Sequence, residues 1–583
     1  MLPSTPPDSG PTLALIEASL TAISVAAAFA WPRLGSACFA RIERPFARLA
    51  RKQGLSICVA GFAALLLRLA ILPVIPIPLP FAADDFSFLL AANTFLHGRL
   101  ANPTPAMWTH FETIHVTMWP TYQSMYFPAQ GLLLAAGKLL FGNPWFGILL
   151  SSALMCAAIC WMLQAWLPPA WALLGGLLSV LHLALFSYWV NTYHAAGCIS
   201  ALGGALVLGA MPRLIKTARF RYGMSMAVGI VLLAGTRPYE GLLLCLPVAF
   251  VLGRWMLFGK NRPSAVLLLR RSAAPLALVI AAAAWMGYYA YRAFGNPLTL
   301  PYSVDRAQYA IAPYYVWQSP RPEPAYRHEE MRHFYHEDEA DYYFKIHKRS
   351  MFLPLTLGKA SGGLQFFAGT ALLIPIIMAR RVFLDRRIRL LLVCVLVLAA
   401  GLSIEIYMLP HYLAPFTVAF YAIGLQAMRH LRLWRPEGRR AGLAMVRLSV
   451  ALCCLMAGLR LCAAPLNLLP AEWPPYHWNF PWYGPAHYGT DRARIEAQLQ
   501  QLPGKELVIV RYTPEHNPLD EWVYNAADID GSKVVWAREM DAVDNLELFH
   551  YYPDRKVWLA EPDAQPASVS PYPVPQQLTA ASH

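Results

Sequence analysis

The sequence predicts a polytopic α-helical membrane protein with a small C-terminal α/β domain. Of its 583 residues, 57% are hydrophobic and 14% are charged, whereas soluble proteins carry about a quarter charged residues. Apolar runs near the ~20 residues that a spanning helix needs recur from Pro11 to Leu468. Beyond about residue 470 these runs stop and the chain becomes acidic.

Clusters of Lys and Arg between the apolar runs predict the topology. Positive loops face the cytoplasm, so the helices between them must come in pairs, which gives about twelve crossings with both chain ends outside. The basic clusters lie at 33–52, 213–221, 254–271, 380–389 and 429–447. The predicted helices span 11–31, 54–78, 145–166, 171–190, 194–212, 223–235, 239–257, 272–293, 352–379, 388–408, 412–428 and 442–463.

Two stretches do not fit the pattern of simple membrane crossings. Residues 128–141 are apolar but short, and counting them as a crossing would put Arg213 outside, so we interpret them as a helix in the membrane interface. Residues 223–257 have basic flanks on both sides, so they must hold two short helices that meet at 236–240. Non-helical backbone at membrane depth needs protein or a cavity around it.

The domain organisation follows from this topology. We expect an extra N-terminal helix and a cytoplasmic basic loop over 1–53, and a membrane domain over 54–469 with external loops at 79–144 and 295–351. Residues 329–348 are expected to form a surface helix. Strand and helix patterns in the tail predict an external α/β domain over 470–563. Residues 564–583, rich in Pro, Ser, Ala and Gln, are expected to be disordered.

Two adjacent carboxylates, Asp84 and Asp85, follow directly on the second predicted helix. Desolvation opposes charge at a membrane boundary, so an acidic pair there indicates a function. Acidic residues also cap helices, and Asp84 as the cap of a helix over 85–97 is the structural alternative. The loop that follows is longer than a simple connection. It holds polar and aromatic side chains suited to binding a sugar, among them His110, Glu112, His115, Tyr122 and Tyr126.

These motifs resemble the GT-C glycosyltransferases, a superfamily that includes protein O-mannosyltransferases and the aminoarabinose transferases of lipid A. The resemblance rests on the order of the acidic pair Asp84-Asp85, the segment AANTFLHGRL at 91–100, and the aromatic-Pro segment at 126–128 that opens an apolar helix. It covers much of residues 54–430. The superfamily more often has Asp-Glu in the first position and Pro-Pro in the last.

The resemblance implies an inverting glycosyltransferase. An acceptor nucleophile would attack the anomeric carbon of a polyprenyl-phosphate sugar, and a carboxylate would take the acceptor proton. We expect Asp84 to be this base and Asp85, about 100° away on a helix, to orient the loop or the acceptor, and the choice between them stays open. The acceptor would be a lipid, a glycan or a protein. The site and the tail would face the periplasm of a bacterial inner membrane.

The leaving phosphate also needs cations or hydrogen-bond donors. The candidates are Arg237 with Glu240 at the break between two helices, His411 and Tyr412 at an outer helix start, and Tyr188, Asn191 and His194 in an outer turn. Their structural alternatives are an ion pair, interfacial aromatic anchoring and a hydrogen-bonded turn. No spacing of metal ligands is present, so we expect no dedicated metal site. A divalent cation held by the two carboxylates stays an open alternative.

Two other classes of function compete with transfer. A transporter or flippase of lipid-linked saccharides would place charges mid-membrane and often shows inverted repeats, whereas the acids here cluster at the outer edge. A non-catalytic membrane assembly protein would act through its tail. Nucleic-acid binding is not expected, because the basic residues follow the topology instead of forming a patch.

Overall fold

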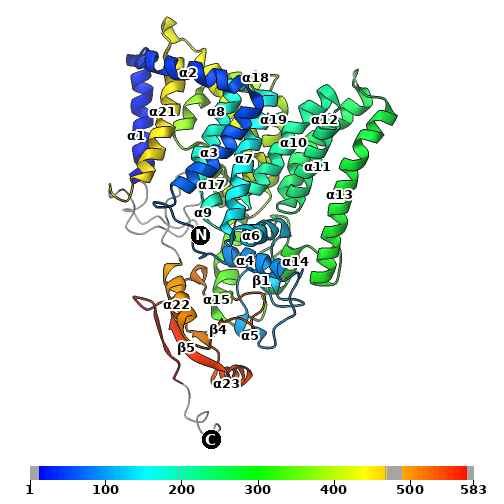
Figure 1. Ribbon diagram of the computed structural model, residues 1–583, viewed down its shortest axis with the longest axis vertical. Coiled ribbons are helices and arrows are strands. Elements are labelled where there is room, and N and C mark those ends of the chain that lie inside the picture. The colour runs from blue at the N-terminus through cyan, green and yellow to red at the C-terminus, as the bar shows by residue number, and fades with distance from the viewer. Residues whose placement is uncertain (1–11, 195, 261, 467, 469–488, 574–583) are drawn as a thin grey trace.

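The computed structural model describes residues 12–194, 196–260, 262–466, 468 and 489–573. Figure 1 shows a bundle of long helices at one end and a small sheet domain at the other. Segments that leave the bundle fold between these two parts. The start of the predicted tail domain, residues 470–488, lies outside the described residues.

The bundle confirms a polytopic helical architecture. Seven helices among the described residues are long and apolar enough to cross a membrane. A further pair, α17 (Arg349–Ala368) and the helical stretch Ala371–Leu384 (η3 and α18), is bent by 111° at its break. The seven are α1 (Thr12–Ala30), α3 (Gln53–Ala70), α7 (Trp145–Trp166), α10 (Gly197–Thr217), α12 (Pro238–Phe258), α13 (Ala265–Phe294) and α21 (Ala441–Leu461).

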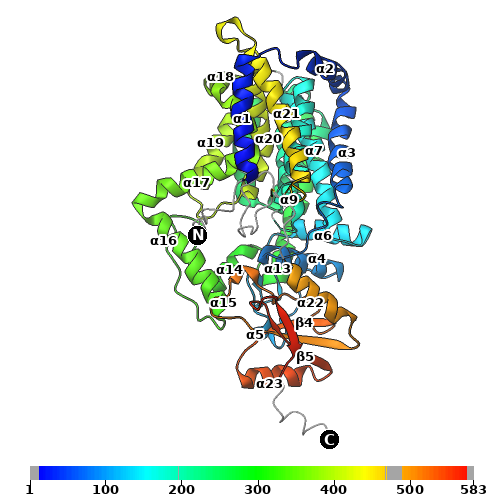
Figure 2. The same ribbon diagram turned by 90° about the vertical axis from the view of Figure 1, so that its left-hand side faces the viewer.

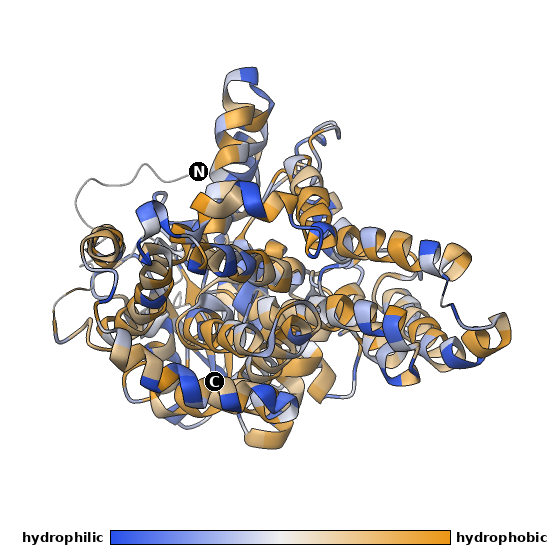
Figure 3. Ribbon diagram, turned by 90° about the horizontal axis from the view of Figure 1, so that it is seen from above, coloured by the Kyte–Doolittle hydropathy of each residue, from blue (hydrophilic) through white to orange (hydrophobic). Residues whose placement is uncertain are grey.

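The remaining helices of the bundle are shorter, so the count of about twelve crossings stays a prediction. They are α8 (Pro169–Ser179) with η1 (Val180–Leu185), α11 (Phe220–Ala234), α19 (Arg389–Ser403) and α20 (Thr417–Arg432). Each range that we expected to cross nevertheless contains a helix. Most helix turns seen from above carry hydrophobic residues, as a lipid-facing bundle requires (Figure 3).

The α11–α12 junction explains one of the short helices. The 15 residues of α11 rise only about 22 Å, less than the ~30 Å hydrocarbon core. Arg237 follows this helix and Pro238 begins α12. The two helices meet within residues 234–238, as we expected, but the prediction that both are short is wrong for α12, which has 21 residues. The break leaves the Arg237 guanidinium where the two helices meet.

The basic clusters gather at the end of the bundle that lies far from the sheet domain. Figures 1 and 2 show α2 (Ser36–Arg51), α18 (Ala379–Leu384) and the α20–α21 connection there. The expected basic loop is wrong for residues 36–51, which form a helix instead. Its arginines recur every three or four residues, as in an amphipathic helix with one charged face. Arg447 anchors it through an ion pair with Glu43 at 2.8 Å.

The first of the two segments that we expect to be external, 79–144, is folded throughout most of its length, and it is called the first external segment below. It contains α4 (Ala83–Leu96), α5 (Trp108–Phe111), the short strands β1 (Val116–Thr117) and β2 (Gln123–Ser124), and α6 (Pro128–Phe141). Figure 2 shows α6 lying across the direction of α7, as expected for an interfacial helix.

The second external segment, 295–351, contains α14 (Pro301–Tyr309), α15 (Glu329–Arg332), η2 (His333–Glu339) and α16 (Ala340–His347). The helix predicted over 329–348 is therefore confirmed in its position. It is not a purely solvated helix, because Met331, Tyr335 and Tyr343 are buried.

The C-terminal domain is the predicted α/β unit. Strand β3 (Lys505–Val510) pairs in parallel with β4 (Val534–Arg538) and β5 (Arg555–Glu561). Helices α22 (Thr490–Gln501) and α23 (Ala542–Tyr551) accompany this sheet. The expected disorder is wrong for β6 (Ser568–Pro571), which pairs antiparallel with β5, because backbone pairing at a sheet edge needs no apolar side chains. Residues 574–583 lie outside the described residues.

The C-terminal domain shares a hydrophobic core with both external segments. Leu507 and Val535 of the sheet belong to the same buried cluster as Ile114 and Tyr335. The rings of Phe86 in α4 and Tyr524 stack at 4.4 Å. The tail therefore stabilises the external segments, and these position the site described below.

Cysteine labelling tests the topology. In a cysteine-free background, exposed cysteines replacing Ala106 and Glu547 should react with a membrane-impermeant maleimide in spheroplasts. Cysteines replacing Thr217 and Ser264, at the basic end, should react only after permeabilisation, because positive loops stay in the cytoplasm. Reaction of the cysteine at position 217 in intact spheroplasts would show either that the two sides are assigned the wrong way round or that α6 crosses the membrane.

Candidate functional site

A cavity of about 1310 Å³ lies between the ends of the bundle helices, the two external segments and the C-terminal domain. Pockets for small ligands commonly measure about 300–1,000 Å³, so this one has room for more than one small group. Of the residues predicted from the sequence, eight line it: Asp84, His115, Tyr126, His194, Arg237, Glu240, His411 and Tyr412.

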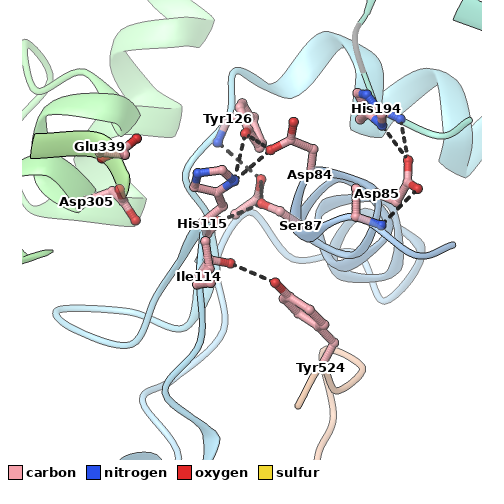
Figure 4. Close-up of polar contacts among 12 residues, drawn as sticks. Asp84, Asp85, Ser87, Ile114, His115, Tyr126, His194, Asp305, Glu339 and Tyr524 are labelled. Carbon is pink, nitrogen blue, oxygen red and sulfur yellow. Dashed lines mark hydrogen bonds and ion pairs between the residues drawn. The ribbon is translucent and has the colours of Figure 1, made fainter. Parts of the chain in front are cut away.

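Asp84 lies in the first turn of α4 and is half-buried. The Tyr126 hydroxyl donates to its Oδ1, and His115 Nδ1 lies 2.6 Å from the same oxygen (Figure 4). Tyr126 Oη and His115 Nδ1 are 3.2 Å apart. These contacts fix one carboxylate oxygen, and Oδ2 has no hydrogen-bond partner of its own among the described residues. The carboxylate can therefore accept a proton or a hydrogen bond from a molecule in the cavity.

The charge state of this pair follows from its surroundings. Burial opposes ionisation of Asp84, but the charge and hydrogen bond of His115, aided by His194 and Tyr126, hold the pKa of Asp84 well below its usual value. Burial likewise opposes protonation of His115, yet Asp84, Asp305 and Glu339 together raise the pKa of His115. At neutral pH the two form an ion pair.

Asp85, although adjacent in sequence, is fully buried and does not line the cavity. Its Oδ1 accepts the backbone N–H groups of Tyr193 and His194 at 2.8 and 2.9 Å, and His194 Nδ1 lies at 2.8 Å. Its Oδ2 accepts the N–H groups of Phe81 and Ala82. Asp85 therefore caps α4 and ties it to the 193–194 turn, so the alternative that Asp84 is the cap is wrong.

The backbone at His115 is held in an uncommon conformation. Its φ is +62°, the left-handed region that costs non-glycine residues about 1 kcal/mol or more. The Ser87 hydroxyl donates to its carbonyl at 2.7 Å, and the Phe334 ring packs edge-on at 5.4 Å. These contacts keep the imidazole directed at Asp84.

The second external segment supplies residues that sequence reasoning missed. Asp305 and Glu339 lie on the side of His115 opposite Asp84 (Figure 4). Arg306 is buried and its Nη1 lies 2.5 Å from Glu339. Burial raises the pKa of Asp305 to about 6, against the charges of His115 and Arg306. The Tyr- and acid-rich composition of residues 295–351 was the sequence signal that could have indicated these site residues. A solvated helix has the same composition, so this signal did not distinguish the two.

Charged side chains also meet inside the cavity. Arg237 lies 3.6 Å from Glu240, and its guanidinium stacks over the Tyr412 ring at 4.1 Å. Lys359 of α17, absent from the sequence prediction, is buried and donates to the backbone carbonyl of Glu405 at 2.5 Å. All five residues line the cavity. Arg237 lies at the start of α12 and Lys359 in the middle of α17, so the cavity holds cations from two different helices, where a phosphate could bind.

The other predicted binding residues do not line the cavity. His110 contacts the carbonyls of Arg538 and Asp544, and the Tyr122 hydroxyl donates to the Asn525 carbonyl at 2.9 Å. These contacts join the first external segment to the C-terminal domain. Glu112 pairs with Arg327 and His328.

Two further predicted residues stabilise the outer turn near α9 (Tyr188–Asn191). Asn191 accepts from Arg68 at 2.9 Å and donates to two backbone carbonyls. Tyr188 contacts His411 Nδ1 through its hydroxyl at 2.8 Å. The hydrogen-bonded turn considered as the alternative is therefore present. Of its three predicted residues His194 alone lines the cavity, as does His411, the partner of Tyr188.

No protein-family model matches the chain. No curated protein matches it in sequence. A search of solved structures returns an oligosaccharyltransferase of Archaeoglobus fulgidus, with 11% identity, a TM-score of 0.44, and 87% of this chain and 68% of that one covered. It also returns ArnT of Cupriavidus metallidurans bound to undecaprenyl phosphate, with 13% identity, a TM-score of 0.46, and 85% and 92% covered.

Both proteins are GT-C glycosyltransferases, the superfamily that the sequence motifs resemble. The identities are low and the TM-scores lie below 0.5.

The different surroundings of the two carboxylates predict different effects on stability. Asp85→Asn should lower the melting temperature clearly, because an amide nitrogen would face buried N–H donors, each costing about 1–3 kcal/mol when unsatisfied. Asp84→Asn should lower the melting temperature less, because it loses the ion pair with His115, but residue 84 is half-buried and keeps an oxygen for Tyr126. Thermal melts of both variants in the same detergent give the comparison. Equal destabilisation by the two substitutions would contradict these roles.

Proposed function

We propose that the chain is an inverting glycosyltransferase that moves a sugar from a polyprenyl-phosphate donor to an acceptor of the cell envelope. One observation carries this proposal: Asp84, a carboxylate with an unoccupied oxygen, shares a cavity with the cations Arg237 and Lys359 of two different helices. A proton acceptor and a phosphate-binding group are the two parts that the reaction needs.

In the proposed reaction the acceptor oxygen forms a bond to the anomeric carbon while the bond from that carbon to the phosphate oxygen breaks. The acceptor proton passes to Asp84 Oδ2, and polyprenyl phosphate leaves. The low pKa of Asp84 makes it a weak base that is always ionised at neutral pH. Such a base works best when it takes the proton late, as the new bond makes the acceptor oxygen acidic.

The donor phosphate is proposed to lie beside these two cations. Arg237 faces an acid and an aromatic ring, and Lys359 donates to the backbone carbonyl of Glu405 and interacts with the charge of that residue. A phosphate can therefore add to this network and accept charge-assisted hydrogen bonds from both cations. The lipid tail would continue from here into the bilayer beside the bundle.

The proposal places the cavity and the C-terminal domain on the periplasmic side of a bacterial inner membrane. The grouping of the basic segments at the opposite end supports this orientation. The acceptor, whether lipid, glycan or protein, would then enter from the aqueous side, where the C-terminal domain forms part of the cavity wall.

Asp84→Asn should lower transfer by about 10²–10⁴-fold, the usual effect of removing a general base. Donor binding should change little, because the phosphate and the lipid provide most of its contacts. Transfer rate and donor affinity of purified protein measure the two effects separately. A variant with near-normal transfer would remove Asp84 as the base and favour a transporter or an assembly protein.

His115→Asn should shift the acid limb of the pH–rate profile to higher pH. His115 lowers the pKa of Asp84, so removing its charge raises that pKa, and the ionised form then disappears at a higher pH as the solution is acidified. Asn tolerates a positive φ and keeps a donor for Asp84. Tyr126→Phe, which removes only a hydrogen bond, is the matched control and should shift the limb less. If the acid limb of the pH–rate profile stays unchanged in His115→Asn, His115 has only a packing role.

A further inference from the structure

The N-terminal helix α1 carries one charged side chain, and the reaction proposed above assigns it no role. Glu17 is the only charged residue of α1, and it is 3% exposed. A charged side chain within a membrane-spanning helix is costly and usually has a function. The contacts of Glu17 therefore indicate what α1 does beyond anchoring the chain in the membrane.

The Glu17 carboxylate lies at the break that follows α17. Its Oε1 accepts the backbone N–H groups of Thr370 and Ala371, each at 3.0 Å. These groups lie at the start of η3 (Ala371–Met378), and the first N–H groups of a helix have no partner within that helix. The hydroxyls of Thr21, one turn further along α1, and Thr370 are 3.1 Å apart. α1 thus satisfies the start of a helix that is distant in sequence.

The backbone of the break is shaped for this contact. Gly369 has a φ of +54° and a ψ of −158°, a conformation that is essentially restricted to glycine. A Cβ atom at this position would lie 2.6 Å from Glu17 Oε1. Glycine therefore permits two features at once, the bend of 111° between α17 and the stretch Ala371–Leu384 and the close approach of the carboxylate.

Helix α17 connects this break to the cavity. It runs obliquely from the bundle to α16 (Figure 2), and six of its 20 residues are buried. One face of α17, with residues three or four positions apart, forms part of the cavity wall. The residues of this face are Leu355, Gly358, Lys359 and Gly362. Because little of α17 is buried, its direction depends on how its ends are held.

The length of α17 amplifies any change at the break. Lys359 precedes Gly369 by ten residues, which corresponds to about 15 Å of helix. A pivot of about 10° at Gly369 would therefore move Lys359 by about 2.6 Å. A shift of this size breaks a hydrogen bond, whose donor and acceptor must lie within ~2.7–3.2 Å. The position of Lys359 in the cavity thus requires a fixed angle at the break.

We propose that Glu17 is a positioning residue of the donor site, which fixes the break after α17 and so holds Lys359 within reach of the donor phosphate. The inference rests on the proposed phosphate site, and it gives α1 a function in donor binding. Glu17 does not line the cavity, so it acts through α17. Arg237 belongs to the α11–α12 junction and Asp84 to α4, and neither depends on this contact.

Binding of undecaprenyl phosphate to the full chain in nanodiscs tests the inference without any transfer step. Lys359→Met should weaken binding about tenfold, the usual value of one charge-assisted hydrogen bond. Glu17→Ala leaves two N–H groups without their acceptor and should weaken binding about three- to tenfold, because Lys359 is no longer held in place. Glu17→Gln keeps an acceptor oxygen and should bind like the wild type.

Glu43→Ala is the matched control. It also removes a carboxylate that joins the N-terminal region to the bundle, through Arg447 of α21, but it does not contact α17. This variant should bind undecaprenyl phosphate like the wild type. It separates the proposed role of Glu17 from a general loosening of the N-terminal region.

A double-mutant cycle separates positioning from a purely structural role. In the Lys359→Met background, Glu17→Ala should change binding by less than about twofold, because the group that Glu17 positions is already absent. A structural role would give the same loss in both backgrounds. Should Glu17→Ala fail to fold, Glu17→Asp takes its place. Its side chain is one methylene shorter and should give a smaller loss that also disappears in Lys359→Met.

Two sets of results would overturn the inference, and they can be told apart. It fails alone, with the phosphate site intact, if Glu17→Ala, or Glu17→Asp in its place, binds like the wild type or loses as much affinity in Lys359→Met as in the wild type. It also fails alone if Glu17→Gln binds as weakly as Glu17→Ala. It fails together with the proposed phosphate site if the wild type does not bind undecaprenyl phosphate or if Lys359→Met binds equally well.

Discussion

The buried carboxylate of Asp85 is the interaction on which the arrangement of the site depends. It accepts backbone N–H groups from the start of α4 and from the turn at Tyr193 and His194. One side chain thus joins the first external segment to the helical bundle. Because neighbouring helical residues point about 100° apart, anchoring Asp85 inside turns Asp84 toward the cavity.

A second constraint comes from the shared core of the C-terminal domain and the external segments. Ile114, next to His115, lies in the same buried cluster as Leu507 and Tyr335. The hydroxyl of Tyr524 donates to the Ile114 carbonyl at 3.2 Å. His115 is therefore held from two directions, by the soluble domain through its neighbour and by Asp84 through its ring. The domain contributes to the geometry of the site as well as to its wall.

Local signals in the sequence were sufficient for much of this structure. Apolar runs predicted the helices, and β-branched strands predicted the tail domain. The adjacent acids Asp84 and Asp85 indicated the start of α4. Long-range contacts were not accessible in this way: nothing local shows that His110 and Tyr122 contact the C-terminal domain, or that Lys359 joins Arg237 in the cavity. The strand β6 was missed because its pairing uses backbone groups, which composition does not reveal.

We propose that one cavity holds a donor phosphate beside Arg237 and Lys359 while Asp84 faces the acceptor. A structure of the Asp84→Asn variant with a polyprenyl-phosphate sugar bound is the decisive measurement. We expect phosphate oxygens within hydrogen-bond distance of Arg237 and Lys359, with the anomeric carbon facing residue 84. A phosphate bound away from both cations, or a sugar directed away from residue 84, would contradict it.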